Sequence, residues 1–361
     1  MLFSVGEVDA LRLLRWCRYV SAQDLVSVFS EETLAVLLSF KLITRYEKGG
    51  AYVLTNAGHR FLNSYLPNMP PHVRPSYRES DFTKRSQTAR FFLTAYQAGL
   101  SVFQTRPSCL EINGSCYLTA QGRGRGSNPW GSTRIAAVLR LGNLICGVHY
   151  VGEPAGQVVV SDEIRTFQNN TAHVKGTAHS FVYTGESYDS ILSELAKPYD
   201  EGSKKRASYA EAFHRLPQPV FLIPSDRIGS QQLRIMCRAD YRTRMTHAAL
   251  GAAYHPSPTQ YADWDAMFRG TAFLMAADMD LKRIDRAVQY AKADRFPPVY
   301  MVALKGQEKI LLKRYKSTGL AQGVFTFKTD RPEIQRDLQL YVPPMRQFET
   351  EKGDVVLAPH L

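Results

Sequence analysis

Apolar residues near the N-terminus recur every three or four positions and then change to the two-residue period of a hairpin. This helical spacing, together with residues that cap helix N-termini, predicts short helices at 8–14, 22–29, 30–42 and 56–65. Two apolar runs flank the turn Lys48-Gly49-Gly50, which predicts a β-hairpin over 43–54. Three helices, a hairpin and a closing helix are the order of a winged-helix unit, in which the third helix reads DNA.

The outward face of the predicted third helix carries Glu31 and Glu32. Acidic groups near a phosphate backbone reduce affinity, so DNA contact by this unit is expected from cations near the hairpin. The cations assigned to this contact are Lys41, Arg45 and Lys48. The passage from Leu54 to Leu62 resembles the wing-to-helix passage of bacterial winged-helix proteins. A winged helix that binds protein instead of DNA is the alternative.

Proline-rich sequence separates this unit from the rest of the chain and predicts a basic linker at 67–85. Beyond it, helical patterns lie at 86–98, 188–196, from about 230 onward, and at 281–293. Strand patterns lie at 115–120, 134–141, 144–150, 180–184, 220–224, 271–277, 299–304 and 310–315. The expected fold class is therefore α/β (α+β), with an N-terminal winged helix at 1–66 followed by a mixed-sheet α/β domain at 86–342. A division into two subdomains near 200–217 is one option, and an extended tail is expected at 343–361.

The charge of the chain is strongly positive. Its 361 residues carry a formal net charge of +12, which favours a polyanionic partner, most often nucleic acid. Much of the excess lies in residues 71–140, which hold ten cationic and only three acidic residues. This region is the electrostatic centre of the sequence.

Within the basic region, glycines alternate with two arginines between Gln121 and Ser132. Such a loop lays guanidinium groups along a phosphate chain, and a tryptophan in it can stack on an unpaired base. The expected DNA contacts of the region are Arg74, Arg78, Lys84, Arg85, Arg123, Arg125 and Trp130. The expected partner is DNA, duplex or single-stranded. A solvated hairpin tip is the alternative for this loop.

Motifs for bound groups are missing from the sequence. It contains no phosphate-binding loop and no dinucleotide fingerprint, so we expect no cofactor. Its five cysteines are odd in number and form no Cys-x-x-Cys pair, which favours reduced thiols and no zinc site. No apolar run approaches eighteen residues and no signal peptide is evident. We therefore expect a cytoplasmic protein without a membrane partner.

A nuclease of the restriction-endonuclease type is the best enzymatic candidate. It needs an Asp on one strand and Glu-x-Lys on the next, to hold a divalent cation and position water. Asp278 and Asp280 follow one predicted strand and Lys305 follows the next, but Ala303 stands where the glutamate is required. We therefore expect no catalytic centre, with metal-dependent cleavage as the alternative.

The whole arrangement resembles winged-helix accessory proteins of bacterial mobile elements, of the replication-relaxation type found beside conjugation genes. The resemblance is carried by the N-terminal unit and by the segments 132–139, 220–226 and 273–286. It implies a DNA-binding helper at an origin of transfer or replication, which recruits a relaxase or replication protein and catalyses nothing itself. The alternatives are a nuclease-like enzyme targeted by the winged helix, and a protein–protein adaptor.

Overall fold

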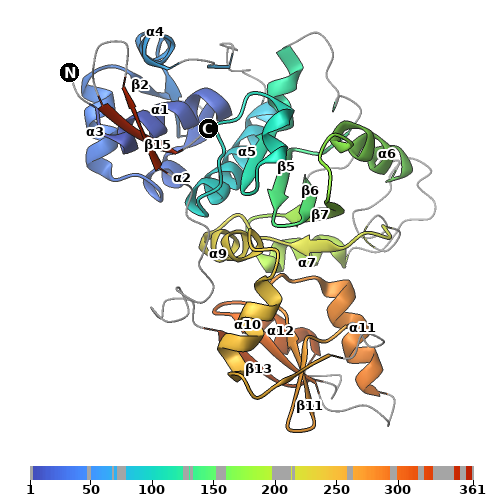
Figure 1. The fold of residues 1–361 in the computed structure, drawn as a ribbon. Helices are drawn as coiled ribbons and strands as arrows, with labels where there is room; N and C mark the ends of the chain where they lie inside the picture. The colour runs from blue at the N-terminus through green and yellow to red at the C-terminus, as the bar shows by residue number, and fades with distance from the viewer. Residues whose placement is uncertain are drawn as a thin grey trace.

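The computed structural model describes residues 3–46, 50–66, 69–70, 79–124, 130, 133–151, 160–196, 213, 216–257, 263–292, 299–315, 321–327, 345–349 and 355–359. In these residues a small N-terminal unit precedes two α/β units, each built around a five-stranded sheet (Figure 1). The mixed α/β class predicted from the sequence is confirmed.

The N-terminal unit, residues 3–66, consists of α1 (Val5–Cys17), β1 (Tyr19–Ser21), α2 (Ala22–Val26), α3 (Glu31–Ser39), β2 (Ile43–Tyr46), β3 (Ala51–Leu54) and α4 (Asn56–Tyr65). Strand β3 lies between β1 and β2 and is antiparallel to both. Helices begin where a hydroxyl accepts a hydrogen bond from a first-turn backbone N–H, as Ser30 does for α3 and Thr55 for α4. The predicted helices and hairpin strands are present, and β1 is a strand that the sequence pattern did not predict.

The first α/β unit, residues 79–222, consists of α5 (Glu79–Gln97), the 3-10 helices η1 (Pro107–Glu111) and η2 (Thr119–Gly124), β4 (Ser115–Leu118), β5 (Ala137–Leu141), β6 (Leu144–Tyr150), α6 (Val160–Thr171), β7 (Ala178–Thr184), α7 (Tyr188–Leu195) and β8 (Val220–Leu222). The strands lie in the order β4-β5-β6-β7-β8. The first three are antiparallel, and β6, β7 and β8 are parallel.

Helices α9 (Arg227–Met236) and α10 (Tyr241–Leu250) lead into the second α/β unit, residues 255–327. This unit consists of β9 (His255–Pro256), β10 (Ala266–Phe268), β11 (Thr271–Met275), α11 (Leu281–Lys292), β12 (Val299–Leu304), α12 (Glu308–Tyr315) and β13 (Ala321–Phe327). The strand order is β9-β10-β11-β12-β13, again with an antiparallel first half and a parallel second half.

The two α/β units therefore have the same topology: three antiparallel strands, a helix, a parallel strand, a helix and a final parallel strand. Their second and third strands are joined by two-residue turns with positive φ angles, at Gly142-Asn143 (Gly142 φ 58°) and at Arg269-Gly270 (φ 49° and 76°). The single mixed sheet expected from the sequence is two sheets. The boundary falls after β8 and not at 200–217, because β8 pairs with β7.

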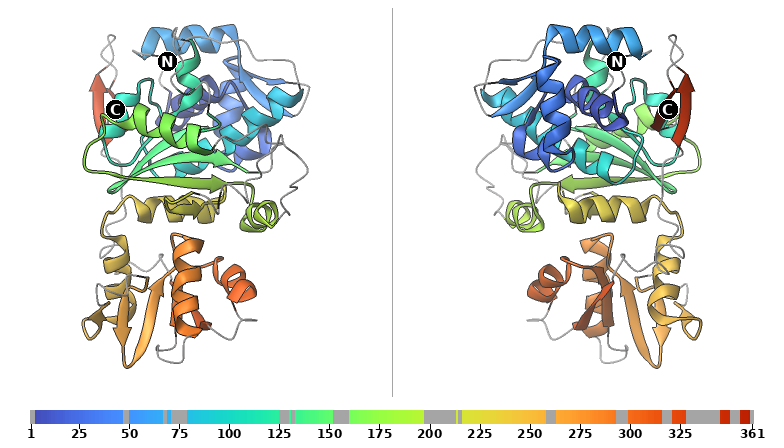
Figure 2. Two further views of the ribbon diagram at one scale, coloured as in Figure 1. Left: turned by 90° about the vertical axis from the view of Figure 1, so that its right-hand side faces the viewer. Right: turned by 90° about the vertical axis from the view of Figure 1, so that its left-hand side faces the viewer.

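The N-terminal unit and the first α/β unit lie side by side (Figure 2), and one hydrophobic core joins them. The Trp16 and Phe103 rings meet edge to face with centroids 5.3 Å apart, and the Arg12 guanidinium lies 3.9 Å from the centroid of the Phe103 ring. Helix α5 begins at Glu79, inside the predicted linker, and Phe82 stacks on Tyr19. The N-terminal unit is thus packed against the first α/β unit and is not a separate domain joined only by a linker.

Two other predictions are wrong in secondary structure. Residues 310–315 belong to helix α12 and not to a strand, because Leu311 and Tyr315, four positions apart, are the buried pair. The apolar run that suggested a strand includes Leu312, which is 36% exposed.

The predicted tail contains an antiparallel pair, β14 (Met345–Glu349) and β15 (Val355–Pro359), and β15 contacts α1. None of the described helices has the length and apolar character needed to span a membrane.

Because this core is shared, we expect Trp16→Ala to destabilise both units together. Trp16 is 4% exposed, and truncating a buried aromatic residue costs about 3–5 kcal/mol of unfolding free energy. Urea unfolding followed by circular dichroism should show one transition at lower urea. The control Phe40→Ala, at a side chain 43% exposed, should change stability by less than about 1 kcal/mol. A separate early transition of the N-terminal unit in the wild type would contradict a shared core.

Candidate functional site

Two of the predicted DNA-contacting cations are exposed on the N-terminal unit. Lys41 follows α3 in the left-handed conformation, with φ 54°, and its carbonyl accepts a hydrogen bond from the Thr55 hydroxyl at 2.6 Å. Arg45 lies on β2, where its Nε donates to the Tyr52 hydroxyl at 3.3 Å. The end of α3 and the first strand of the hairpin therefore present two positive charges to solvent, four residues apart in the sequence.

The other predicted DNA contacts are not brought together in the described part of the chain. Lys48, Arg74, Arg78 and Arg125 lie outside the described residues, as do the side chains of Lys84 and Arg123. Arg85 is half-buried, and its positive charge acts on the thiol of Cys17, whose pKa is raised by burial.

The predicted base-stacking role of Trp130 is wrong. Its side chain is 1% exposed, and its ring packs against Phe167 of α6 with centroids 6.4 Å apart. The Trp130 carbonyl also accepts hydrogen bonds from the backbone N–H and the hydroxyl of Thr133, both at 3.0 Å. A large apolar ring inside a glycine-rich stretch looks available in sequence, but here it is part of the second core.

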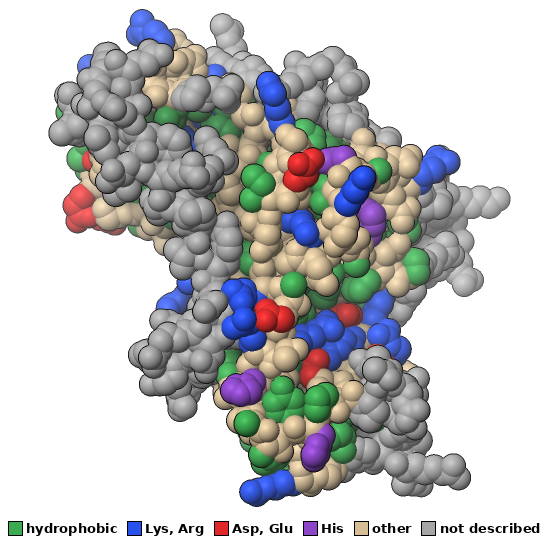
Figure 3. Space-filling model, in the orientation of Figure 1, with side chains coloured by type: hydrophobic (Ala, Val, Ile, Leu, Met, Phe, Trp, Pro, Cys, Tyr) green, Lys and Arg blue, Asp and Glu red, His purple; other side chains and the backbone are tan. Residues whose placement is uncertain are grey.

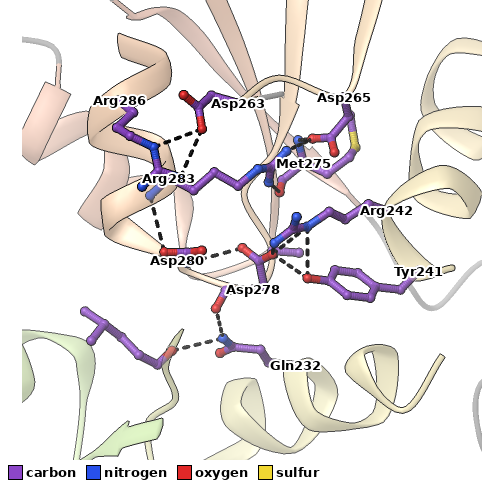
Figure 4. Close-up of polar contacts among 12 residues, drawn as sticks. Gln232, Tyr241, Arg242, Asp263, Asp265, Met275, Asp278, Asp280, Arg283 and Arg286 are labelled. Carbon is purple, nitrogen blue, oxygen red and sulfur yellow. Dashed lines mark hydrogen bonds and ion pairs between the residues drawn. The ribbon is translucent and has the colours of Figure 1, made fainter. Parts of the chain in front are cut away.

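Asp278, the first of the weak catalytic candidates, is fully buried beyond the end of β11 and accepts hydrogen bonds from three residues (Figure 4). Arg242 of α10 donates to Oδ2 from Nη2 at 2.6 Å and from Nε at 2.9 Å, and the Tyr241 hydroxyl donates to the same oxygen. The backbone N–H of Asp280 donates to Oδ1 at 3.2 Å. Burial favours a raised pKa for Asp278, but the charges of Arg242 and Arg283 and these hydrogen bonds lower it.

Asp280 has a different role and a different ionisation. Burial, and then the charge of Asp278, raise its pKa to about 6. Its Oδ1 accepts the backbone N–H of Arg283 at 3.2 Å, so it caps the first turn of α11. Asp226 is likewise a helix cap, because it accepts the N–H groups of Ile228 and Gly229 at the start of α9.

Further ion pairs extend this cluster along α11. Arg283 pairs with Asp265 at 2.5 Å, and Arg286 pairs with Asp263 at 3.0 Å. Lys305 is exposed in the turn after β12, whereas Asp278 is enclosed. The surface in the middle of the face drawn in Figure 3 accordingly shows basic and acidic side chains interspersed.

The contacts around Asp278 therefore indicate a structural role for this cluster. A divalent cation needs several free carboxylate oxygens, whereas Oδ2 of Asp278 already accepts from Arg242 and Tyr241. Among the described residues, no group of three or more His, Cys, Asp or Glu side chains is arranged to hold a metal ion. The role of Arg242 could not be predicted from the sequence, because its partner Asp278 lies 36 residues further along the chain.

A second buried polar cluster lies at the corresponding place of the first α/β unit. Glu163 on α6 accepts the backbone N–H of Arg134, which precedes β5, at 3.1 Å, and lies 3.5 Å from Nε2 of His149 on β6. Burial and the charge of Arg134 lower the pKa of His149 to about 3, so the ring is neutral. Both units thus fill the end of their third strand with their own polar side chains. The sequence offered no signal for His149.

The two units meet at the carboxyl ends of their parallel strands, the position where α/β sheets usually bind ligands. Tyr188, after β7, accepts a hydrogen bond from Nε2 of Gln307, after β12, at 2.7 Å. The Tyr188 hydroxyl donates to Oε1 of Gln232 at 2.6 Å, and Nε2 of Gln232 donates to the carbonyl of Asp278 at 2.7 Å. These side chains are buried, so the two sheet ends close each other.

A polar cleft of about 1020 Å³ lies between α2, α5 and the start of α9. Its cationic and acidic side chains are equal in number: Arg90, Arg227, Arg234, Asp24, Glu186 and Asp226. Arg90 bridges Asp24 at 3.1 Å and Glu186 at 2.6 Å, which ties the N-terminal unit to the turn after β7. The balance of charge makes this cleft a poor site for a polyanion.

Replacing the buried carboxylate tests its structural role. We expect Asp278→Asn to lower the unfolding free energy at pH 7 by about 3–5 kcal/mol, because Arg242 loses its charged partner. The pKa of Asp278 is lowered in the folded protein, so its contribution is present at neutral pH and is lost as the pH falls below the ordinary range of an aspartate. Urea unfolding between pH 3 and 7 measures both effects.

Asp280→Asn is the matched control. Its folded-state pKa of about 6 lies above the unfolded value, so the wild type loses stability as the pH rises from about 4 to 6. The variant should remove that loss. Its unfolding free energy at pH 7 should equal that of the wild type or exceed it by up to about 3 kcal/mol. Equal destabilisation by the two variants would contradict the separate roles of the carboxylates.

Comparison of the chain with protein-family models, with curated proteins and with solved structures finds no match. The site must therefore be interpreted from its own residues.

Proposed function

We propose that this chain is a DNA-binding accessory protein of the kind found in bacterial mobile elements, with an N-terminal winged helix that contacts the phosphate backbone. One observation carries the proposal. Helix α3 contacts the strand β2 of the hairpin β2–β3, and the exposed cations Lys41 and Arg45 lie where α3 ends and β2 runs. Two positive charges, one where α3 ends and one on the hairpin strand β2, suit the phosphates that flank a groove.

The net charge of +12 supports the same proposal, because an excess of this size attracts polyanions over a long range. The chemistry of the body supports an accessory role. Asp278 forms an ion pair with Arg242, and Asp280 caps α11. The carboxylates considered for catalysis therefore make structural contacts. The protein would then act by binding DNA and bringing a second protein, such as a relaxase or replication protein, to it.

A protein–protein adaptor is the second candidate, and the surface of α3 favours it. Glu31, Glu32 and Ala35 are exposed on this helix, and Phe40 at its end is 43% exposed. An acidic face with an exposed aromatic ring suits a protein partner better than a phosphate backbone.

Fluorescence anisotropy with labelled duplex and single-stranded DNA across a salt series tests the DNA proposal. Six to eight phosphate contacts on duplex predict a slope of log affinity against log salt of about −5 to −7. Lys41→Glu/Arg45→Glu should weaken binding at least about tenfold and flatten the slope by about one to two units.

The control Arg165→Glu/Lys175→Glu makes the same change of net charge at exposed positions of the first α/β unit. It should leave affinity within about threefold. An equal loss in both double variants would mean that only total charge matters. Binding that is absent or independent of salt would overturn the proposal.

Charge reversal on α3 separates the two candidates. If α3 faces DNA, Glu31→Lys/Glu32→Lys removes repulsion and adds attraction, so affinity for duplex should rise about tenfold or more at low salt. If α3 faces a protein partner, DNA affinity should rise no more than in a variant with two lysines introduced elsewhere, such as Asp162→Lys/Asp189→Lys. Fluorescence anisotropy measures the duplex affinity of both double variants.

A further inference from the structure

A groove of about 480 Å³ lies between α7 and α12, the helices that follow the fourth strand of each α/β unit. Its apolar lining residues are Leu192 and Leu195 on α7, Ala196 after it, Ile310 on α12, Leu281 at the start of α11, and Phe213. The volume is in the range of ordinary binding pockets, and an apolar floor of this kind accepts aliphatic side chains.

The α12 side of the groove is cationic. Lys313 lies on the rim with its side chain 83% exposed, and Lys309, one helical turn earlier, is also exposed. The rim acid Asp189 lies 3.9 Å from Lys313, but both side chains are largely exposed, so this pair is weak. The Glu308 carboxylate accepts the backbone N–H of Gly306 and is used in starting α12.

We propose that this groove binds an acidic amphipathic helix of a partner protein. A row of apolar side chains on such a helix would enter between Leu192 and Ile310, and carboxylates beside that row would meet Lys309 and Lys313. A nucleic acid offers phosphates but no aliphatic side chains for the floor. A basic helix would be repelled by the α12 rim.

The groove is preformed by the contact between the two units. Tyr188 is the first residue of α7 and Gln307 immediately precedes α12, and the hydrogen bond between their side chains, at 2.7 Å, sets the two helix starts against each other. Little conformational freedom is then lost when the partner binds, which favours affinity. The site lies on the α/β units and uses neither Lys41 nor Arg45, so it is independent of the DNA proposal.

The test uses the full-length chain and a fluorescein-labelled synthetic peptide of about 18 residues, with leucines at helical spacing and glutamates at most other positions. The comparison peptide has lysine in place of every glutamate. The acidic peptide should bind saturably and at least about tenfold more tightly than the basic one. Lys309→Glu/Lys313→Glu should remove at least about tenfold of that affinity, and Arg165→Glu/Lys175→Glu should leave it within about threefold.

Ile310→Ser tests the apolar floor and should also weaken binding of the acidic peptide by about tenfold. Lys309 and Lys313 are exposed, so their variant stays informative if Ile310→Ser fails to fold by circular dichroism. Equal affinity for both peptides, no saturable binding, or equal loss in the charge control would overturn the proposal. Duplex DNA binding, measured in parallel, should be unchanged in Ile310→Ser.

Discussion

The second α/β unit is organised around a fully buried charge, the carboxylate of Asp278. Removing an unpaired carboxylate from water costs several kcal/mol even after the protein relaxes, so the fold must supply partners. Arg242 and Tyr241 supply them from α10, and the start of α11 supplies the N–H of Asp280. The same ion pair therefore holds two helices on the end of β11. The same contacts occupy Oδ2 of Asp278, the residue that the sequence suggested first as a metal ligand.

Buried polar groups are used in the same way at two other places. In the first unit the end of β6 is filled by His149 and Glu163, and between the units Tyr188, Gln232 and Gln307 bond to one another. In the described residues, both units of this repeated topology thus place their own polar side chains at the strand ends where a ligand usually binds. On the proposals made above, recognition uses the outer surface: the cations of the N-terminal unit and the groove between α7 and α12.

The shared core gives those surfaces a fixed relation to each other. Trp16 packs on Phe103, and Arg90 bridges α2 and the turn after β7, so the N-terminal unit cannot turn freely on the body. On the proposed function, DNA and a helical partner would be held at a set distance and orientation. An accessory protein that assembles other molecules needs such rigidity more than it needs a catalytic group.

The sequence by itself determined the local elements. Caps such as Ser30 and Thr55, the hairpin turn at Gly142 and the apolar runs of β6, β11 and β12 act over a few residues, so their pattern is visible along the chain. It also determined the charge excess. Only the tertiary structure decided that Trp130 is buried, that residues 310–315 are helical, that the chain has two sheets of one topology, and that Asp278 is neutralised by Arg242. These outcomes depend on contacts between residues far apart in sequence, and burial and ion pairing depend on that surrounding packing and not on neighbouring residues.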